Sequence, residues 1–300
     1  MKDILIVGTG ALATLFAARL AQAGSRVTML GTWQAALDSL HEYGARLLDT
    51  DGNEHQFRVG VTSDVRECRG AQYALMLVKA WQTERAARQL KECLADGGLV
   101  VTLQNGLGNR ESLARCLGEE RVALGATTTG ATLLGPGLVR AGGEGVISIE
   151  RHPALGPVEV MLRAAGFQVN LVEDAQSLIW GKLVINAAIN PLTALLRVSN
   201  GKLLEVPPAR EMMGILATEA AQVAAAEAID LPFSDPVAAA EEVAQKTAAN
   251  HSSMLQDVLR GAPTEIDAIC GAVVRAAERH KLNTPANWAC WKLVKALGES

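Results

Sequence analysis

Near the start of the chain stands the sequence Ile4-Leu5-Ile6-Val7-Gly8-Thr9-Gly10-Ala11-Leu12-Ala13. Its first four residues predict a short buried strand, and Leu12 to Ala23 predicts a helix that ends before Gly24. Between them lies GxGxxA, the dinucleotide-binding fingerprint with alanine at the third glycine position. Backbone N–H groups and the helix dipole hold a pyrophosphate at such a turn. We therefore predict that residues 8 to 13 bind a dinucleotide, because this strand and helix context disfavours a purely steric need for glycine.

The following segments alternate between strand and helix. Further apolar runs of strand length are Arg26–Leu30, Tyr73–Val78 and Leu99–Leu103. A charged helical segment from about Thr83 to Leu94 separates the last two. Such alternation predicts an α/β protein with an N-terminal Rossmann-type, doubly wound parallel sheet. Glycine and threonine abound from Val122 to Ile149, around Pro136-Gly137, which predicts extra strands joined by turns.

The character of the chain changes beyond about residue 172, where alanine-rich stretches have the helical period. These stretches are Ala175–Leu196, Ala209–Ala228, Pro236–Asp257, Glu265–His280 and Pro285–Leu297. Prolines such as Pro191 and Pro263 are expected at or near their ends, because proline lacks a backbone donor. We predict an all-helical C-terminal domain, with residues 1–172 binding the dinucleotide and residues 173–300 binding the substrate.

Composition excludes several classes of function. The formal net charge of −4 and the 4% aromatic content disfavour nucleic-acid binding, which needs a basic face and stacking rings. The five cysteines lack a CxxC pair and the five histidines lie apart, which disfavours a disulfide framework and a metal site. No segment offers the roughly 18 uninterrupted apolar residues of a membrane span, and the first residues lead directly into the fingerprint strand. We expect a soluble cytoplasmic enzyme without metal.

The end of the second predicted strand bears on the choice of cofactor. Leu30 is followed by Gly31-Thr32-Trp33-Gln34, so no carboxylate is present to receive the ribose hydroxyls of NAD. The sequence therefore favours NADP(H), although the arginine that commonly meets its 2′-phosphate is missing as well. We expect Thr32 and backbone amides to serve instead, and NAD(H) stays open.

Polar residues follow two other predicted strands. Lys79 follows one strand and Asn105 the next, at the sheet edge where open α/β sheets bind ligands. We expect both on the cofactor side, although each has an ordinary alternative, a surface lysine and a turn residue before Gly106.

A second polar group lies in the helical half. Lys182, Asn186 and Asn190 stand at steps of four and share one helical face. A lysine beside a bound carbonyl stabilises the developing alkoxide and supplies a proton, and asparagines orient the substrate. The alternative is an internal network that satisfies these polar groups structurally.

A third group follows in the stretch from Asn250 to Glu265. Asn250, Ser253 and Asp257 stand at i, i+3 and i+7, which predicts one polar helical face. Glu265 is expected in the first turn of the next helix, where a capping role is the ordinary alternative. For Asp257 the alternative is an ion pair with a nearby base.

Taken together, these residues resemble the ketopantoate reductase family over essentially the whole chain. The matching pieces are Gly8–Ala13, Val78–Ala80, Leu103–Gly106, Gly125–Gly145, Trp180–Pro191 and Asn250–Glu265. The resemblance implies NADPH-dependent reduction of 2-dehydropantoate to pantoate, by hydride transfer to the keto carbon. It also implies that Lys182 is the catalytic lysine and that Glu265 positions substrate, cofactor and lysine. The departure from the family pattern is Gly31-Thr32.

By the same resemblance, further residues complete the site and the assembly. The substrate side comprises Asn105, Asn186, Asn190, Asn250, Ser253 and Asp257. Lys79 and Asn105 contact the cofactor. The substrate is a small 2-oxo acid, and the resemblance is compatible with a homodimer.

Other readings remain. Dehydrogenases of the 3-hydroxyisobutyrate and 6-phosphogluconate type also use a Lys-x-x-x-Asn step, which Lys182 and Asn186 match. A paralogue that acts on another 2-oxo acid is harder to exclude, because family likeness does not determine the acyl group. A non-catalytic dinucleotide sensor is a third reading, and Lys182 together with Glu265 argues against it.

Overall fold

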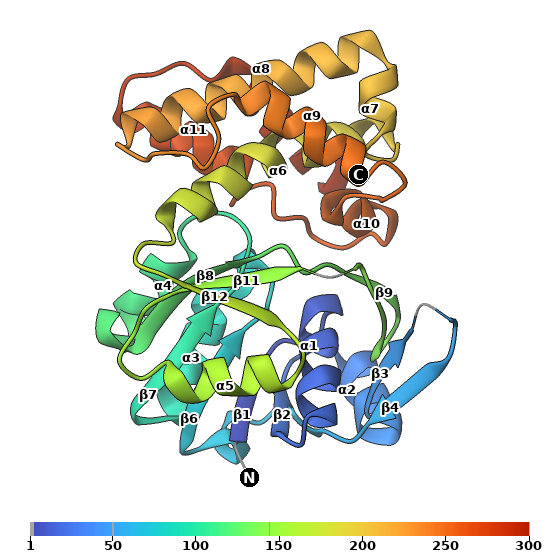
Figure 1. The fold of residues 1–300 in the computed structure, drawn as a ribbon, viewed down its shortest axis with the longest axis vertical. Helices are drawn as coiled ribbons and strands as arrows, with labels where there is room; N and C mark the ends of the chain where they lie inside the picture. The colour runs from blue at the N-terminus through green and yellow to red at the C-terminus, as the bar shows by residue number, and fades with distance from the viewer. Residues whose placement is uncertain (1–2, 50, 144, 300) are drawn as a thin grey trace. The chain divides into compact units, whose positions relative to one another are not determined.

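The computed structural model describes residues 3–49, 51–143 and 145–299. The chain divides into two compact units (Figure 1). Unit 1 comprises Met1–Gln104 and Asn109–Ala175, and unit 2 comprises Asn105–Gly108 and Gln176–Ser300. The main division therefore lies close to the expected boundary at residues 170 to 174. The assignment of Asn105–Gly108 to unit 2 was not predicted.

Unit 1 is built on a mostly parallel sheet with the strand order β12-β11-β8-β7-β6-β1-β2-β5. Its strands are β1 (Asp3–Val7), β2 (Arg26–Leu30), β5 (Gly60–Thr62), β6 (Ala71–Met76), β7 (Leu94–Thr102), β8 (Val122–Thr127), β11 (Val146–Glu150) and β12 (Gln168–Val172). From β5 to β8 the neighbours are parallel, and β11 pairs antiparallel with β8. The order from β5 through β1 to β8 is the Rossmann order, so the predicted fold class is confirmed.

Helices cover unit 1 and explain the continuous apolar run of β1. They are α1 (Ala11–Gln22), α2 (Gln34–Tyr43), α3 (Thr83–Cys93), α4 (Asn109–Leu117) and α5 (Gly156–Ala164), with short 3-10 turns η1 (Val65–Cys68), η2 (Ala80–Gln82) and η3 (Glu119–Arg121). Ile4 and Ile6 enter one apolar core with Phe16 of α1, whereas Leu5 and Val7 enter another with helices α3 and α4. Alternate side chains point to opposite faces, so a strand buried on both faces must be apolar throughout.

A smaller sheet in unit 1 has the order β4-β3-β10-β9. It consists of β3 (Ala45–Leu48), β4 (Glu54–Phe57), β9 (Ala131–Gly135) and β10 (Leu138–Ala141). The turn between β9 and β10 contains Pro136-Gly137, and Gly137 has φ +67°. The predicted extra strands are thus confirmed, but they are shared between two sheets, since β8 and β11 belong to the main one.

Unit 2 is helical, as predicted. It contains α6 (Gln176–Leu196), α7 (Lys202–Glu205), α8 (Pro207–Ala226), α9 (Pro236–Lys246), α10 (Ser253–Leu259), α11 (Cys270–Arg279) and α12 (Pro285–Glu299). Small residues such as Ala187 of α6 and Ala217 of α8 are fully buried in its core, which lets helices approach closely. Within the described residues α6 alone is long and apolar enough to cross a membrane, and 72% of its apolar window is buried in the structure. The burial identifies α6 as a core helix of unit 2.

Two predicted helix boundaries are wrong. The stretch Pro236–Asp257 is not one helix, because α9 ends at Lys246 and α10 begins at Ser253 after a loop. The helix expected to start at Glu265 begins only at Cys270, after a series of turns. The predicted stretch Ala175–Leu196, in contrast, agrees with α6, and Pro191 lies inside this helix toward its C-terminal end.

The interior position of Pro191 is accommodated by a neighbouring thiol. Proline has no N–H to donate to the carbonyl four residues earlier, which leaves the Ala187 oxygen without its helical partner. The Cys270 Sγ of α11 lies 4.0 Å from this oxygen, at the range of a weak S–H donor. This weak contact between α6 and α11 therefore partly replaces the hydrogen bond that Pro191 cannot form within α6.

The start of α12 depends on a buried carboxylate of α8. The two Glu219 oxygens accept hydrogen bonds from Ala286 N and Asn287 N, each at 2.9 Å, and Asn287 Nδ2 donates to the same carboxylate. These backbone groups are first-turn donors without an intrahelical acceptor. Glu219 is 7% exposed, so its charge is stabilised by these donors and by the positive end of α12.

We expect Glu219→Ala to lower the free energy of unfolding by about 3 kcal/mol, because it leaves buried donors without an acceptor. Urea unfolding followed by circular dichroism measures the change. The matched control is Glu211→Ala on the exposed side of the same helix, which should change stability by less than about 0.5 kcal/mol. Equal stability of the two variants would contradict the structural role of Glu219.

Candidate active site

The fingerprint turn of unit 1 has the geometry of a phosphate site. Gly8 has φ +130°, and a Cβ built there would lie 3.0 Å from the Leu77 carbonyl oxygen, so only glycine fits without strain. A Cβ on Gly10, in contrast, meets no described atom within 4 Å, which leaves room for a ligand beside the backbone. Gly10 is the N-cap of α1, and no side chain among the described residues caps this end. Its N–H groups and dipole are therefore suited to a pyrophosphate.

The turn after β2 explains why a charged residue is missing there. A Cβ on Gly31 would lie 2.5 Å from Thr9 Cγ2, and Thr9 is buried with 6% exposure. The fingerprint threonine thus occupies the space that a side chain at position 31 would need. The next residue, Thr32, is exposed, and its Oγ1 accepts a hydrogen bond from Arg85 Nη2 of α3 at 3.0 Å. Arg85 was not among the predicted site residues.

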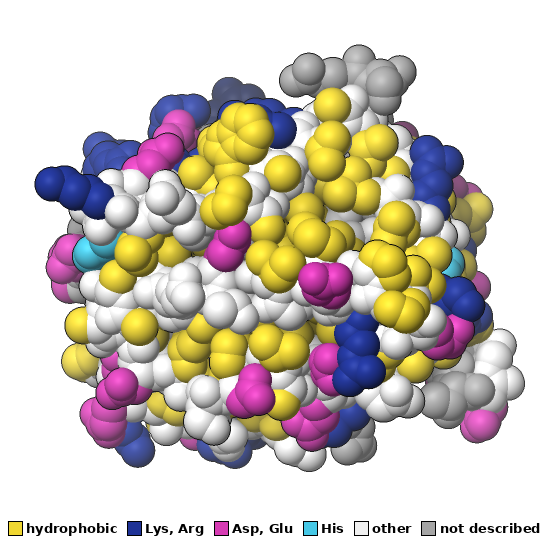
Figure 2. Space-filling model, turned by 90° about the horizontal axis from the view of Figure 1, so that it is seen from above, with side chains coloured by type: hydrophobic (Ala, Val, Ile, Leu, Met, Phe, Trp, Pro, Cys, Tyr) yellow, Lys and Arg dark blue, Asp and Glu magenta, His cyan; other side chains and the backbone are white. Residues whose placement is uncertain are grey.

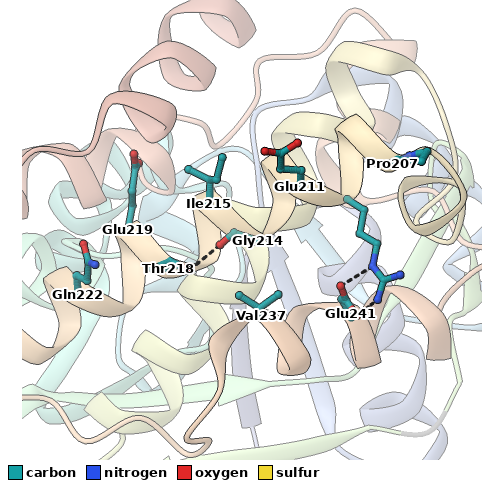
Figure 3. Close-up of a pocket in the computed structure, with 10 residues that line it drawn as sticks. Pro207, Glu211, Gly214, Ile215, Thr218, Glu219, Gln222, Val237 and Glu241 are labelled. Carbon is teal, nitrogen blue, oxygen red and sulfur yellow. Dashed lines mark hydrogen bonds and ion pairs between the residues drawn. The ribbon is translucent and has the colours of Figure 1, made fainter.

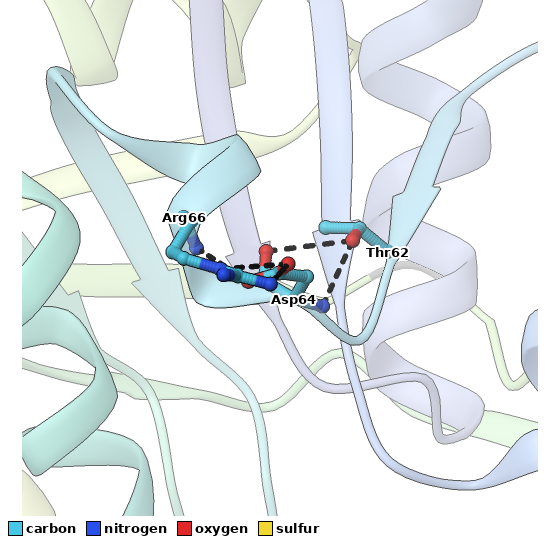
Figure 4. Close-up of polar contacts among 3 residues, drawn as sticks. All are labelled: Thr62, Asp64 and Arg66. Atoms are coloured by element: carbon cyan, nitrogen blue, oxygen red, sulfur yellow. Dashed lines mark hydrogen bonds and ion pairs between the residues drawn. The ribbon is translucent and has the colours of Figure 1, made fainter.

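Another arginine in the same region is neutralised. Arg66 of η1 binds the Asp64 carboxylate through Nε at 2.9 Å and Nη2 at 2.6 Å (Figure 4). This hydrogen bonding lowers the pKa of Asp64 to about 2, so the carboxylate stays charged. Thr62 joins the turn, since its Oγ1 accepts from Asp64 N and its carbonyl oxygen accepts from Gly31 N.

The ends of β6 and β7 are tied together by Gln104. Its Nε2 donates to the Val78 carbonyl oxygen at 2.8 Å and to Thr83 Oγ1 at 2.9 Å, where α3 begins. Thr102 Oγ1 donates to Gln104 Oε1 at 3.0 Å. These bonds hold the segment that carries Lys79, which immediately precedes η2. Gln104 lies in the matching piece Leu103–Gly106, but this role for it was not predicted.

In unit 2, residues distant in sequence come together at Glu265. Asn105 Nδ2 donates to Glu265 Oε2 at 3.3 Å, and Leu107 N donates to the Ala268 carbonyl oxygen at 3.1 Å. Gly106 has φ +80°, and a Cβ there would lie 2.4 Å from that same Ala268 oxygen. This close approach requires glycine and assigns the segment to unit 2.

Lys182 of α6 belongs to the same group. Its surroundings exclude much of the solvent, and this burial lowers the pKa of its amine to about 8. The negative charge of Glu265 favours the ammonium form and opposes the shift. Glu265 itself is 6% exposed, so a buried carboxylate and a titratable amine act on each other. Asn186 and Asn190 follow on the same helix, half-buried and buried respectively.

The stretch from Asn250 to Asp257 differs from the prediction. Asn250 is exposed in the loop before α10, and its carbonyl oxygen accepts from Asn200 N, so no helical stripe joins it to Ser253 and Asp257. Ser253 is the exposed first residue of α10. Asp257 is 2% exposed and forms an ion pair with Arg260 at 2.9 Å, which matches the structural alternative.

Ser252 has a role that the sequence reasoning missed. It is the N-cap of α10, where its hydroxyl accepts from Leu255 N at 3.1 Å. The same hydroxyl lies 2.7 Å from Thr193 Oγ1, which also donates toward the Asn190 carbonyl oxygen at 2.9 Å. The serine three residues before an apolar position was the available signal for a cap.

Comparison with known proteins identifies the family of the chain. A family model described as ketopantoate reductase PanE/ApbA matches residues 4–154, and the model of the C-terminal part of that family matches residues 174–298. The chain belongs to the ketopantoate reductase family. A 2-dehydropantoate 2-reductase of Halobacterium salinarum is 37% identical over 288 residues, which cover 94% of each protein.

Solved structures of similar proteins cover the whole fold. A ketopantoate reductase family protein from Ralstonia eutropha superposes with a TM-score of 0.91 at 31% identity, covering 99% of this chain and 98% of that one. A D-mandelate dehydrogenase in a ternary structure with NADH and anilino(oxo)acetate superposes with a TM-score of 0.93 at 25% identity, with the same coverage. The ketopantoate reductase fold is therefore shared by proteins with different names.

A groove elsewhere in unit 2 is not part of the predicted site. It has a volume of about 620 Å³ and lies between α8 and α9, where Arg210 pairs with Glu241 at 2.6 Å (Figure 3). Of the described residues that line it, none belongs to the predicted ketopantoate reductase site. Figure 2 shows one face of the molecule. Apolar side chains are common on this face, and charged side chains lie singly among them.

We expect the Lys182 amine to titrate near pH 8, and we expect Glu265→Gln to move this titration to lower pH. Removing the carboxylate removes the interaction that favours the ammonium form, while desolvation remains. NMR of isotope-labelled lysine follows the titration, and Lys182→Arg identifies the signal. The control is Glu278→Gln, an exposed position on α11, which should leave the titration unchanged. A Lys182 signal that titrates like an exposed lysine would contradict the assignment.

Proposed function

We propose that this protein catalyses the NADPH-dependent reduction of 2-dehydropantoate to pantoate. The observation that carries the proposal is the group formed by Asn105, Lys182 and Glu265, in a chain that belongs to the ketopantoate reductase family. Sequence similarity to a 2-dehydropantoate 2-reductase over 94% of the chain supports the same substrate.

The chemistry assigns a proton donor to the chain. The reduced nicotinamide supplies the hydride that the keto carbon accepts. As the carbon gains this electron pair, the carbonyl oxygen becomes an alkoxide, and the Lys182 ammonium stabilises it and donates a proton. A pKa of about 8 suits this role, because the amine is largely protonated at neutral pH yet gives up a proton more readily than an ordinary lysine.

Other side chains would hold the reactants. Glu265 keeps Lys182 charged and accepts the Asn105 amide, which limits the freedom of both groups. Asn186 and Asn190 lie on the same helix as Lys182, one and two turns further on, and we propose that their amides orient the substrate. Ser253 and Asn250, both exposed, remain candidates for the substrate carboxylate or hydroxyl.

The fingerprint residues fit a dinucleotide, and we propose NADPH rather than NADH. The open space beside Gly10 and the uncapped start of α1 support the pyrophosphate site. Gly31-Thr32 offers no carboxylate that would repel a 2′-phosphate. NADH is the alternative, since a D-mandelate dehydrogenase of similar fold was solved with NADH.

A second candidate substrate follows from that neighbour. D-mandelate dehydrogenase shares the fold at a TM-score of 0.93, and its ternary structure contains anilino(oxo)acetate. An aryl 2-oxo acid would undergo the same reduction with the same proton donor. A panel of 2-oxo acids, assayed by the loss of nicotinamide absorbance, distinguishes the two, and faster turnover of the aryl substrate would replace ketopantoate in the proposal.

We expect Lys182→Ala to lower kcat for ketopantoate by at least about 100-fold, because proton transfer and charge stabilisation are both lost. NADPH affinity, measured by fluorescence titration, should stay nearly unchanged. Lys246→Ala serves as the control, since Lys246 is an exposed lysine on α9 that pairs with Glu242. Undiminished turnover in Lys182→Ala would remove this lysine from the mechanism. Absence of turnover in the unchanged protein would favour a non-catalytic dinucleotide sensor.

The assembly and the location remain predictions. We propose that the protein is a homodimer, which the family resemblance supports. We also propose that it is cytoplasmic, because the cysteines among the described residues are free, as is usual in a reducing compartment. Light scattering of the purified protein measures the mass in solution, and a mass of one chain at all concentrations would contradict the dimer.

A further inference from the structure

The end of β2 requires positive charge from another element if the cofactor is NADPH. Residues that follow this strand meet the adenosine ribose in Rossmann domains, and an arginine there accommodates the 2′-phosphate. In this chain the first of these positions is glycine, because Thr9 fills the space that a side chain would need. Thr32 follows with a neutral hydroxyl, and Trp33 adds no charge.

Arg85 brings a guanidinium to this position. Its Nη2 donates to Thr32 Oγ1 at 3.0 Å, although the two residues are 53 positions apart. Arg85 lies in the first turn of α3, and that turn is held by the buried hydrogen bond from Gln104 Nε2 to Thr83 Oγ1 at 2.9 Å. The guanidinium therefore comes from a helix whose start is attached to the strand ends of the sheet.

Arg85 and the nearby Arg66 have different kinds of hydrogen-bond partner. Arg66 is engaged by the Asp64 carboxylate through several hydrogen bonds, and the two charges offset each other (Figure 4). Arg85 donates to a hydroxyl, which leaves its positive charge uncompensated by that bond. A guanidinium has five N–H donors in a planar fork that matches a phosphate, and the bond to Thr32 uses one.

We infer that Arg85, with Thr32, binds the adenosine 2′-phosphate of NADPH and makes this chain prefer NADPH over NADH. The inference rests on the proposed function in one respect, that the fingerprint binds a nicotinamide dinucleotide. The preference comes from α3 instead of from the residue after β2. Thr32 orients the guanidinium and offers its own hydroxyl to the phosphate.

The test compares Arg85→Ala with Arg88→Ala, an exposed arginine one turn further along the same helix. Calorimetry measures binding of adenosine 2′,5′-bisphosphate and of AMP, two fragments that differ only in the 2′-phosphate. Arg85→Ala should weaken binding of the bisphosphate by about tenfold or more and leave AMP unchanged, since a charge-assisted hydrogen bond to the phosphate is lost. In turnover, the KM for NADPH should rise by a similar factor while kcat and the KM for NADH are retained. Arg88→Ala should behave like the unchanged protein.

A second variant tests the same place with opposite charge. Thr32→Glu puts a carboxylate beside Arg85, which should abolish the preference for the bisphosphate and favour NADH. The inference is overturned if Arg85→Ala keeps the preference of the unchanged protein, or if the unchanged protein binds both fragments equally. In either case reduction of ketopantoate with one or the other dinucleotide would still support the proposed reaction. If the unchanged protein binds neither fragment nor either dinucleotide, the inference and the proposed function fail together.

Discussion

The group on which the unit 2 site depends is the buried carboxylate of Glu265. A charge with 6% exposure is tolerated only when donors or opposite charges compensate it. Asn105 supplies a donor and Lys182 supplies a positive charge, and these two residues come from sequence regions far from Glu265. The need to compensate one carboxylate thus accounts for the proximity of α6, the segment after β7 and the turns before α11. It also sets the electrostatics of the amine, because Glu265 partly opposes the effect of burial.

Much of the α/β half could be predicted because its signals are local. Ile4 to Val7 is apolar at each position since the strand is buried on both faces, and Gly8 marks a turn that only glycine can form without strain. The helical half was predicted in kind but less well in detail. The predicted stretch Pro236–Asp257 ran through Thr247 to Ser252, and the helical period did not register the break where Ser252 caps α10. Periodicity reports the face of a helix and gives little information about where it ends.

The features that the sequence did not predict depend on tertiary contacts. The predicted stretch Ala175–Leu196 runs through Pro191, but the Cys270 thiol that lies beside the Ala187 carbonyl comes from a distant part of the chain. Glu265 was expected in a helix, whereas the chain continues in turns up to Ile269 and Asp267 accepts from Trp291 Nε1 at 2.7 Å. Arg85 lies 53 residues from Thr32, and its helical segment reads as an ordinary charged surface helix. A pattern in one sequence does not reveal contacts between residues so far apart. The glycine at position 31 indicates only that positive charge at the end of β2 must come from another element.

The placement of Asn105–Gly108 has a consequence for how the chain can be divided. The backbone passes between the units after Gln104, after Gly108 and again after Ala175. A protease that cut only the third passage would separate residues 176–300 from the rest of the chain, and Asn105–Gly108 would stay on the fragment that carries unit 1. A fragment of residues 176–300, made by itself, would retain Glu265 and Lys182 but lack Asn105, and the Ala268 carbonyl would lose the N–H of Leu107. The helical half is therefore not an independent module in the genetic sense, because four of its residues are encoded within the other half.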